Sequence, residues 1–204
     1  MRWAGRSSAA AHTVGLLDVL LGRKKLKDAS KDKLWALTTA RITMETELGL
    51  KPGGAAAVCF KPLSAADFVR AEDELQELLD LATTTYASRI RRSSDEFGFE
   101  WIVVEDSDHD ELVTTVHLIG SELAARGFGP QLLAAVFRFD DRRRERPVFW
   151  IWGYKRGAFW PFVPTGEGKE RDNAYELELK AKLERELPIE PDLSRWFAMF
   201  DAPL

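Results

Sequence analysis

The clearest potential for ligand chemistry lies in a glycine-containing loop, residues 164–172, which reads Pro-Thr-Gly-Glu-Gly-Lys-Glu-Arg-Asp. Glycines allow backbone N–H groups to approach a ligand, and the loop precedes a predicted helix N-terminus, where anions are favoured. The candidate anion-binding residues are Thr165, Gly166, Lys169 and Arg171. The loop is not a Walker A motif, because Glu170 occupies the Ser/Thr position. A plain connecting loop is the simpler interpretation, and the sequence favours it.

A second candidate surface is the basic turn that follows an aromatic segment. Residues 154–157 read Tyr-Lys-Arg-Gly, and a tryptophan follows at position 160. Aromatic and Arg side chains dominate binding hot spots, so this turn is suited to a protein partner or an anion. The candidate residues are Tyr154, Lys155, Arg156 and Trp160. Spacing permits this turn and the loop at 164–172 to share one basic pocket, but it does not establish that they do.

Residues for enzyme chemistry are not gathered anywhere in the sequence. The three histidines, His12, His109 and His117, are too few and too scattered to suggest a metal site. A nucleophile elbow such as G-x-S-x-G is absent. We therefore predict no catalytic residue, no metal and no cofactor. The single cysteine, Cys59, is expected to be a buried small apolar residue.

The composition is that of a globular protein. The 204 residues are 45% hydrophobic and 30% charged, and the formal net charge of -4 gives no overall attraction to nucleic acid. No stretch approaches the roughly 20 apolar residues that a membrane-spanning helix needs. One cysteine excludes an intrachain disulfide and is compatible with a reducing cytosol.

The N-terminal segment is a candidate for peripheral contact with a membrane. Residues 1–13 are rich in Ala, Ser and Arg and are expected to be a flexible extension. Residues 14–27 are a possible amphipathic helix, which either docks on the core or contacts anionic lipid. The membrane-contact candidates form an apolar face and a basic flank: Leu16, Leu17, Leu20, Leu21, Arg23, Lys24 and Lys25. Asp18 interrupts the apolar run, so we reject a signal peptide.

An aromatic segment, residues 146–162, anchors the predicted fold. Trp150 and Trp152 would point to one side of a strand, whereas Phe149 and Ile151 would point to the other. Neither face of such a strand can remain in water. We therefore predict a central strand that is covered on both sides.

The remaining pattern predicts further strands and helices. We expect strands at residues 42–50, 55–63, 97–105 and 132–139, with a Pro-Gly-Gly turn at residues 52–54. Helices are expected at residues 31–37, 64–82, 108–126 and 175–183. The last segment alternates like a strand, but its Ala, Leu, Glu and Lys content and the i,i+4 pair of Glu176 with Lys180 favour a helix.

Two other segments complete the prediction. Residues 83–95 read as a solvated connection, and residues 193–200 as an apolar tail that packs back onto the domain. The order of elements argues against a doubly wound parallel sheet. It predicts an α+β fold, with a mostly antiparallel sheet of about five or six strands and helices packed on it, in a single domain that spans residues 14–204.

Several short sequence blocks follow one another in a characteristic order along residues 14–204. They are Gly15-Leu-Leu-Asp-Val-Leu-Leu-Gly-Arg23, Ala57-Val-Cys-Phe-Lys-Pro62, Gly127-Phe-Gly-Pro-Gln-Leu-Leu133, Tyr154-Lys-Arg-Gly157 with Phe162, Pro164-Thr-Gly166, Arg171-Asp-Asn-Ala174 and Glu190-Pro-Asp-Leu193 with Arg195-Trp-Phe197. Together they resemble the PspAB family of PspA-associated proteins. Members of that family usually begin near the first block, so residues 1–13 are interpreted as an overextended start.

The resemblance implies an association with the phage shock protein A system, which guards the inner membrane under envelope stress. It implies no established reaction, cofactor or catalytic residue. Our first hypothesis is therefore a non-enzymatic cytoplasmic adaptor that binds a PspA-like coiled-coil protein at or near the inner membrane. The alternative is a sensor of a small ligand, nucleotide or phosphate that uses the loop at 164–172.

Overall fold

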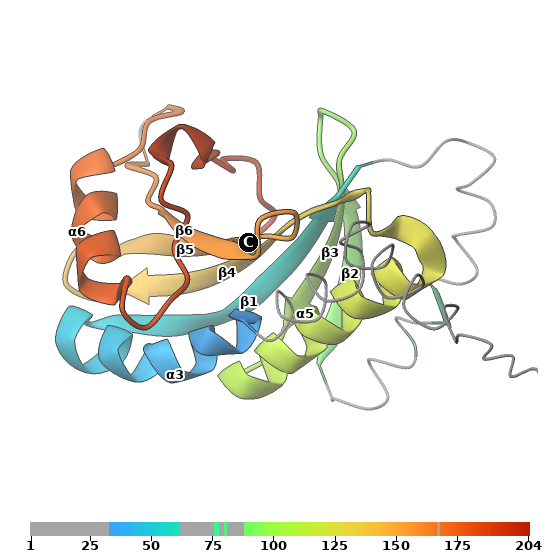
Figure 1. Cartoon of the computed structure of the whole chain (residues 1–204), viewed down its shortest axis with the longest axis horizontal. Helices are drawn as coiled ribbons and strands as arrows, with labels where there is room; N and C mark the ends of the chain where they lie inside the picture. Colours follow the sequence, from blue (N-terminus) through green and yellow to red (C-terminus); the bar gives the residue numbers. More distant parts are fainter. Residues whose placement is uncertain (1–32, 62–75, 78–79, 81–87, 167) are drawn as a thin grey trace, which may run out of the picture.

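The computed structural model describes residues 33–61, 76–77, 80, 88–166 and 168–204. Its centre is a six-stranded antiparallel sheet in the order β2-β3-β1-β4-β5-β6 (Figure 1). The strands are β1 (Leu50–Phe60), β2 (Arg89–Ser94), β3 (Glu100–Glu105), β4 (Leu132–Asp141), β5 (Arg146–Gly153) and β6 (Ala158–Phe162). The helices are α3 (Ala36–Thr43), α5 (His109–Leu123) and α6 (Asn173–Leu183), with short helical segments η1 (Lys33–Trp35), η2 (Met44–Leu48), η3 (Ala124–Phe128) and η4 (Leu193–Arg195). The predicted α+β fold is confirmed.

Helices cover one face of the sheet. Side chains of α3, α5 and α6 join one apolar cluster with the strands, and we call this side the helix face. Figure 1 shows α3 and α5 beneath the long strand β1, with α6 at the β5–β6 end. Trp150 and Trp152 of β5 are buried in this cluster. On α5, buried residues recur at helical spacing from Leu112 to Leu123.

The opposite face carries a second apolar cluster, and we call it the tail face. Phe149 and Ile151 of β5 point to this side, so the aromatic strand is interior and has apolar cover on both faces, as predicted. Among the described residues, the cover here comes from the C-terminal segment, residues 193–204. Trp196 packs into the cluster, and its indole Nε1 donates to the Glu190 carbonyl at 2.9 Å. The predicted tail that packs back is confirmed.

The strand predicted at residues 42–50 is wrong. The helical backbone continues from α3 through η2 and ends at Gly49, whose φ is 72°. Met44 and Leu48 lie four residues apart and are both buried, whereas Ile42 is 61% exposed. The alternating pattern in the sequence therefore came from residues that share one side of a helix, because a spacing of four satisfies both periods.

The turn predicted at residues 52–54 is also wrong, because β1 runs through it. The pairing of β1 with β4 is irregular between Pro52 and Ala56, and a bulge of this kind tolerates a proline and two glycines within a strand. Gly53 has a packing role there, since a Cβ at this position would lie 2.7 Å from Cγ of Arg138.

Residues 89–94, predicted as part of a solvated connection, form the edge strand β2. Arginines do not provide the usual apolar pattern of a strand, but here they form cross-strand ion pairs with β3. Arg89 and Arg91 approach Glu105 at 3.6 and 3.8 Å, and Arg92 approaches Glu100 at 3.7 Å. Charge pairing across the two strands replaces hydrophobic patterning.

The segment at 173–183 is a helix, which confirms the choice made from its composition. Asp172 caps it by accepting from the backbone N–H of Tyr175 at 2.9 Å. Lys180 pairs with Glu184 at 2.6 Å instead of with Glu176, whose carboxylate is turned toward β6. The helix predicted at 64–82 falls mostly outside the described residues.

Candidate functional site

A groove of about 490 Å³ opens on the tail face, between the sheet and the C-terminal segment. We call it the aromatic groove. It is lined by Cys59, Asp95, Phe97, Phe99, Trp101, Leu133, Ala134, Gly153, Lys155, Arg156, Trp160, Arg195, Phe197, Ala198, Met199 and Asp201. Sheet, turn and tail residues therefore meet around one largely apolar hollow.

Two tryptophans line the inner part of the aromatic groove. Trp101 and Trp160 are both buried, and Trp160 is only 5% exposed. Their indole N–H groups are satisfied within the protein: Trp101 Nε1 donates to Asp95 Oδ2 at 2.9 Å, and Trp160 Nε1 donates to the Phe197 carbonyl at 3.0 Å. The two rings therefore present apolar surface to the groove, and neither indole N–H needs a hydrogen bond from a ligand.

The outer part of the groove combines exposed aromatic rings with cations. Phe97 is 61% exposed and Phe197 is 67% exposed, which is unusual for residues of this size. Lys155 and Arg156 are exposed on the turn between β5 and β6, which Gly157 closes by donating its N–H to Gly153 O at 2.8 Å. Exposed aromatic and Arg side chains beside an apolar hollow are typical of a protein-binding surface.

The acidic residues of the groove already have partners. Asp95 accepts from the backbone N–H groups of Phe97 and Phe99, both at 2.9 Å. Asp201 lies 3.4 Å from Nζ of Lys169. The exposed cations Lys155 and Arg156 therefore dominate the charge that the groove offers to a partner.

Tyr154, a sequence candidate from the same turn, lies away from the groove. Its ring packs on α5 at Gly120, where an added Cβ would lie 2.5 Å from the tyrosine Oη. Burial raises the pKa of Tyr154, and its hydroxyl has no hydrogen-bond partner among the described residues. The structure therefore gives Tyr154 a packing position on the helix face.

The cations of the loop at 164–172 are paired with other groups of the protein. Arg171 Nε donates to both carboxylate oxygens of Glu176 at 3.0 Å, and Arg171 Nη1 donates to Trp196 O at 2.6 Å. Lys169 pairs with Asp201 and lies 5.2 Å from the centre of the Phe97 ring. Thr165 and Gly166 are exposed, and the Thr165 N–H donates to Glu170 O at 3.1 Å. In this conformation the loop links the tail to α6.

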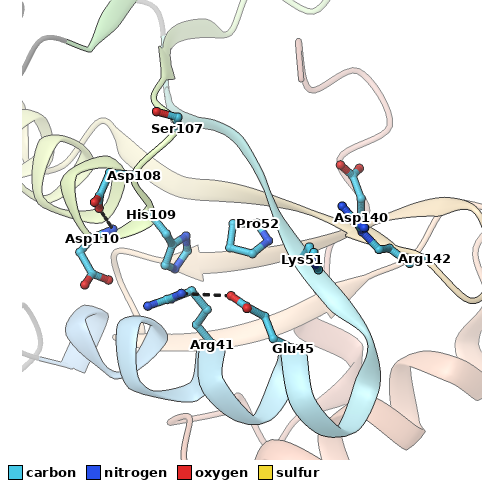
Figure 2. Close-up of a pocket in the computed structure, with 10 residues that line it drawn as sticks. All are labelled: Arg41, Glu45, Lys51, Pro52, Ser107, Asp108, His109, Asp110, Asp140 and Arg142. Atoms are coloured by element: carbon cyan, nitrogen blue, oxygen red, sulfur yellow. Dashed lines mark hydrogen bonds and ion pairs between the residues drawn. The ribbon is translucent and has the colours of Figure 1, made fainter.

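A second hollow, of about 360 Å³, lies on the helix face near the start of α5 (Figure 2). Its lining is polar and includes Arg41, Glu45, Lys51, His109 and Arg142. Sequence reasoning missed this set, because its members come from four separate segments and no motif links them. We call it the polar pocket.

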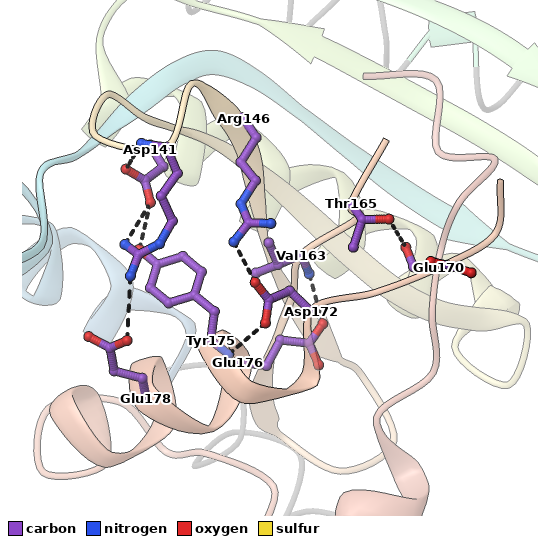
Figure 3. Close-up of polar contacts among 10 residues, drawn as sticks. Asp141, Arg146, Val163, Thr165, Glu170, Asp172, Tyr175, Glu176 and Glu178 are labelled. Atoms are coloured by element: carbon purple, nitrogen blue, oxygen red, sulfur yellow. Dashed lines mark hydrogen bonds and ion pairs between the residues drawn. The ribbon is translucent and has the colours of Figure 1, made fainter. Parts of the chain in front are cut away.

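A buried polar cluster fixes α6 to the hairpin of β4 and β5 (Figure 3). Asp141 is buried and accepts from the Tyr175 hydroxyl at 2.7 Å and from the backbone N–H of Arg143 at 2.8 Å. The Arg144 guanidinium lies 3.7 Å from the centre of the Tyr175 ring and 3.5 Å from Glu178. Tyr175 and Glu178 both belong to α6, so Arg144 has a structural role in joining the hairpin tip to this helix.

Other features bear on the predicted chemistry. Within the described parts of the chain, no group of three or more His, Cys, Asp or Glu side chains is arranged to hold a metal ion. Cys59 is buried as predicted, and burial, with a smaller effect of the Asp95 charge, raises the pKa of its thiol to about 12.

The membrane predictions are tested only in part. No helix among the described residues is both long and apolar enough to cross a membrane. The membrane-contact candidates between Leu16 and Lys25, and the extension at 1–13, lie outside the described residues.

Comparison with known proteins identifies one family. The family model described as PspA associated protein B, PspAB, matches residues 14–204. No curated protein and no solved structure matches the chain. The matched region includes both faces of the sheet, the aromatic groove and the polar pocket, so the chain belongs to the PspA associated protein B family.

Proposed function

We propose that the protein is a non-enzymatic adaptor that binds a PspA-like coiled-coil protein through the aromatic groove. The family name supports an association with PspA. The observation that carries the assignment of the surface is the exposure of Phe97 and Phe197 beside a hollow lined by Trp101 and Trp160. Buried anchors surrounded by exposed aromatic rings are the usual composition of a binding hot spot.

The occupant that fits the groove is a helix with an apolar stripe and acidic neighbours. Helices bind to hydrophobic grooves through side chains at i, i+3 and i+4 spacing, and a coiled-coil partner is built from such helices. The exposed cations Lys155 and Arg156 favour acidic residues beside that stripe. Arg195 is a weaker contributor, because it already lies 3.0 Å from Asp192.

The proposed place of action is the cytoplasm, at the periphery of the inner membrane. This part of the proposal rests on the sequence of residues 14–27, in which four leucines precede a basic flank. The apolar part of this segment, residues 15–22, is only eight residues long and would bind membranes weakly by itself. Recruitment would therefore combine lipid contact with partner binding. A vesicle co-sedimentation assay with anionic and neutral lipids, run with and without the cognate PspA, would separate these two contributions.

The groove assignment is tested by titration calorimetry with the cognate PspA. We expect Arg156→Glu and Phe197→Ala each to weaken binding about tenfold or more, since a hot-spot side chain contributes at least this much. Lys182→Glu is the matched control, because it reverses an exposed charge on α6, away from the groove. Unchanged affinity in both groove variants, with folding intact by circular dichroism, would remove the groove from the proposal.

A sensor function for the loop at 164–172 has less support. Arg171 and Lys169 pair with carboxylates, so an incoming anion would have to compete with Glu176 and Asp201. A thermal-shift screen with nucleotides and phosphorylated metabolites tests this alternative. A ligand present at 100 times its Kd would stabilise the protein by about 2.7 kcal/mol, and Lys169→Ala should abolish that shift.

A further inference from the structure

Residues that line the polar pocket on the helix face have buried polar atoms without a hydrogen-bond partner among the described residues. His109, the first residue of α5, is 6% exposed, and neither of its ring nitrogens has a hydrogen bond within the described chain. Nε of Arg41, on α3, is also buried and has no hydrogen-bond partner in the part of the chain that the structure describes. Figure 2 shows both side chains directed into the hollow between α3, α5 and β1.

Such an arrangement requires a polar occupant. Buried nitrogen atoms in folded proteins nearly always have a hydrogen-bond partner, and here three unpartnered ones belong to residues that line one hollow of about 360 Å³. The other contacts of these side chains are already formed: Arg41 Nη1 donates to Glu45 at 3.1 Å, and the His109 ring packs edge-on against Phe139 with centroids 5.4 Å apart. The two ring nitrogens of His109 and Nε of Arg41 therefore remain available for hydrogen bonds with a molecule or ion that enters the pocket.

Three cations and four carboxylates line the pocket, so an anion is favoured beside the cations and not by the net charge of the lining. Arg41, Lys51 and Arg142 supply three cations, and the N-terminus of α5 adds its positive dipole end. The lining also contains carboxylates, but two of them are occupied: Asp108 Oδ1 accepts from two backbone N–H groups, and Asp140 pairs with Arg138 at 3.0 Å.

The remaining carboxylates do not face the centre of the pocket as free acceptors. Glu45 is engaged by Arg41 at 3.1 Å, and Asp110 extends away from the imidazole in Figure 2. An oxyanion between Arg41 Nε and the His109 ring can therefore accept hydrogen bonds from both without displacing an existing pair.

We infer that the polar pocket binds a compact oxyanion, a phosphate or carboxylate group, held between Arg41 and His109 with Lys51 and Arg142 at the mouth. The volume admits a small metabolite that carries such a group. The site is on the opposite side of the sheet from the aromatic groove, so it does not depend on the proposed function. Failure of either assignment leaves the other standing.

Binding should be coupled to proton uptake by the imidazole. Burial, with a smaller effect of the Arg41 charge, lowers the pKa of His109 to about 4. An anion in contact with the ring stabilises its protonated form, so the pKa of His109 should rise on binding and affinity should increase as pH falls. The charged groups around this ring are Arg41, Glu45, Lys51, Asp108, Asp110, Asp140 and Arg142.

The test is an NMR titration of the full chain with inorganic phosphate, and in parallel with succinate, at constant ionic strength set by chloride. The signals followed are the His109 imidazole, assigned by its loss in His109→Gln, and the Arg41 Nε–H. We expect saturable shifts of both signals with at least one of the two anions, together with a higher His109 pKa. The arm that saturates identifies the phosphate or the carboxylate class.

A matched variant separates specific contact from general charge. Arg41→Lys keeps the positive charge but removes the Nε donor, so it should weaken binding at least tenfold, whereas Lys51→Gln, at the mouth, should weaken it only a few-fold. Shifts that remain linear with both anions, or that are the same in Arg41→Lys, would overturn the assignment and indicate that water fills the pocket. The wild-type titration alone decides the question if a variant fails to fold.

Discussion

Three of the described helices, α3, α5 and α6, pack on one face of the sheet, whereas the described cover of the other face is a segment with little regular structure. On the helix face the apolar cluster is continuous from α3 through α5 to α6. On the tail face a few anchors hold the C-terminal segment: Trp196 packs into the cluster, and Phe200 meets Phe162 edge-on at 4.9 Å. The aromatic groove opens between these anchors. Both faces therefore bury apolar clusters, but among the described residues the exposed aromatic rings, Phe97 and Phe197, lie on the tail face.

The largest expected effect comes from breaking the helix face. Trp150→Ala removes a fully buried indole and should lower the free energy of unfolding by about 3–5 kcal/mol, because the cavity cannot be refilled by a packed core. Urea denaturation followed by circular dichroism measures this loss. Phe197→Ala on the tail face is the matched comparison and should change stability by less than about 0.5 kcal/mol. Equal losses in the two variants would contradict the division between the faces.

The next effect concerns the link between the two faces. Glu176 is 1% exposed and accepts from the backbone N–H of Val163 at 2.8 Å as well as from Arg171, which in turn holds Trp196 O. Glu176→Ala leaves Arg171 partly buried without its carboxylate, so we expect a loss of about 3 kcal/mol. Amide exchange at residues 196–204 should also become faster.

The control for that link is Glu178→Ala, on the same helix. Glu178 is half exposed and pairs with Arg144 at 3.5 Å, so its removal should cost no more than about 0.5 kcal/mol and leave exchange in the tail unchanged. If Glu178→Ala loosened the tail as much as Glu176→Ala, the tail would depend on α6 as a whole and not on the Arg171 pair.

A smaller effect is expected at the cap of α6. Asp172→Ala should cost about 1 kcal/mol through loss of the cap. The hydrogen bond from the Tyr175 backbone N–H, and then that from Arg146, lower the pKa of Asp172. The native carboxylate therefore has a lower pKa than the unfolded one, so its contribution is complete at neutral pH and is lost as pH falls through the folded pKa.

Measurement of stability against pH checks the sign of this effect. The difference between the wild type and Asp172→Ala should shrink as the solution is acidified. Asp172→Asn keeps a capping oxygen and should lose less stability at neutral pH than the alanine variant. A difference that grew toward acid pH would contradict the assignment of the cap.

The smallest effect tests the far end of the tail. Arg91 Nη2 donates to Pro203 O at 2.7 Å, from an exposed position on β2. Arg91→Ala should change global stability by no more than about 0.5 kcal/mol, but it should speed amide exchange near residue 203. Arg89→Ala is the control, because Arg89 pairs with the same Glu105 and has no described contact with the tail. The two variants should therefore differ in local exchange alone.

The sequence predicted the fold correctly where the residue types are compatible with only one local structure. Trp150 and Phe149 on adjacent positions leave no exposed face, so an interior strand was the only outcome. The strong helix formers of residues 175–183 predicted a helix, and in the structure Asp172 caps this helix. The secondary structure predicted for residues 42–48 and 89–94 was wrong. The alternation of the first segment and the charge of the second are each compatible with more than one element, and residues distant in the chain decide which element forms.

The site was predicted less completely than the fold. Lys155, Arg156 and Trp160 come together at the aromatic groove because they share one hairpin, which local sequence can predict. Arg171 appeared in the sequence as a free loop cation, but its partner Glu176 is placed by the turn into α6. His109 and Arg41 meet only through the packing of α5 on α3, and no spacing rule contains that information.

The location of Cys59 gives the tail face a built-in reporter. It is the only cysteine of the chain, and it lines the aromatic groove while remaining buried. Thiol-directed reagents attack the thiolate, so a buried thiol with a raised pKa should label slowly near neutral pH unless the segment above it lifts away. The rate of labelling would then measure how often the groove opens, and protection by an added partner would show directly that the groove has been filled.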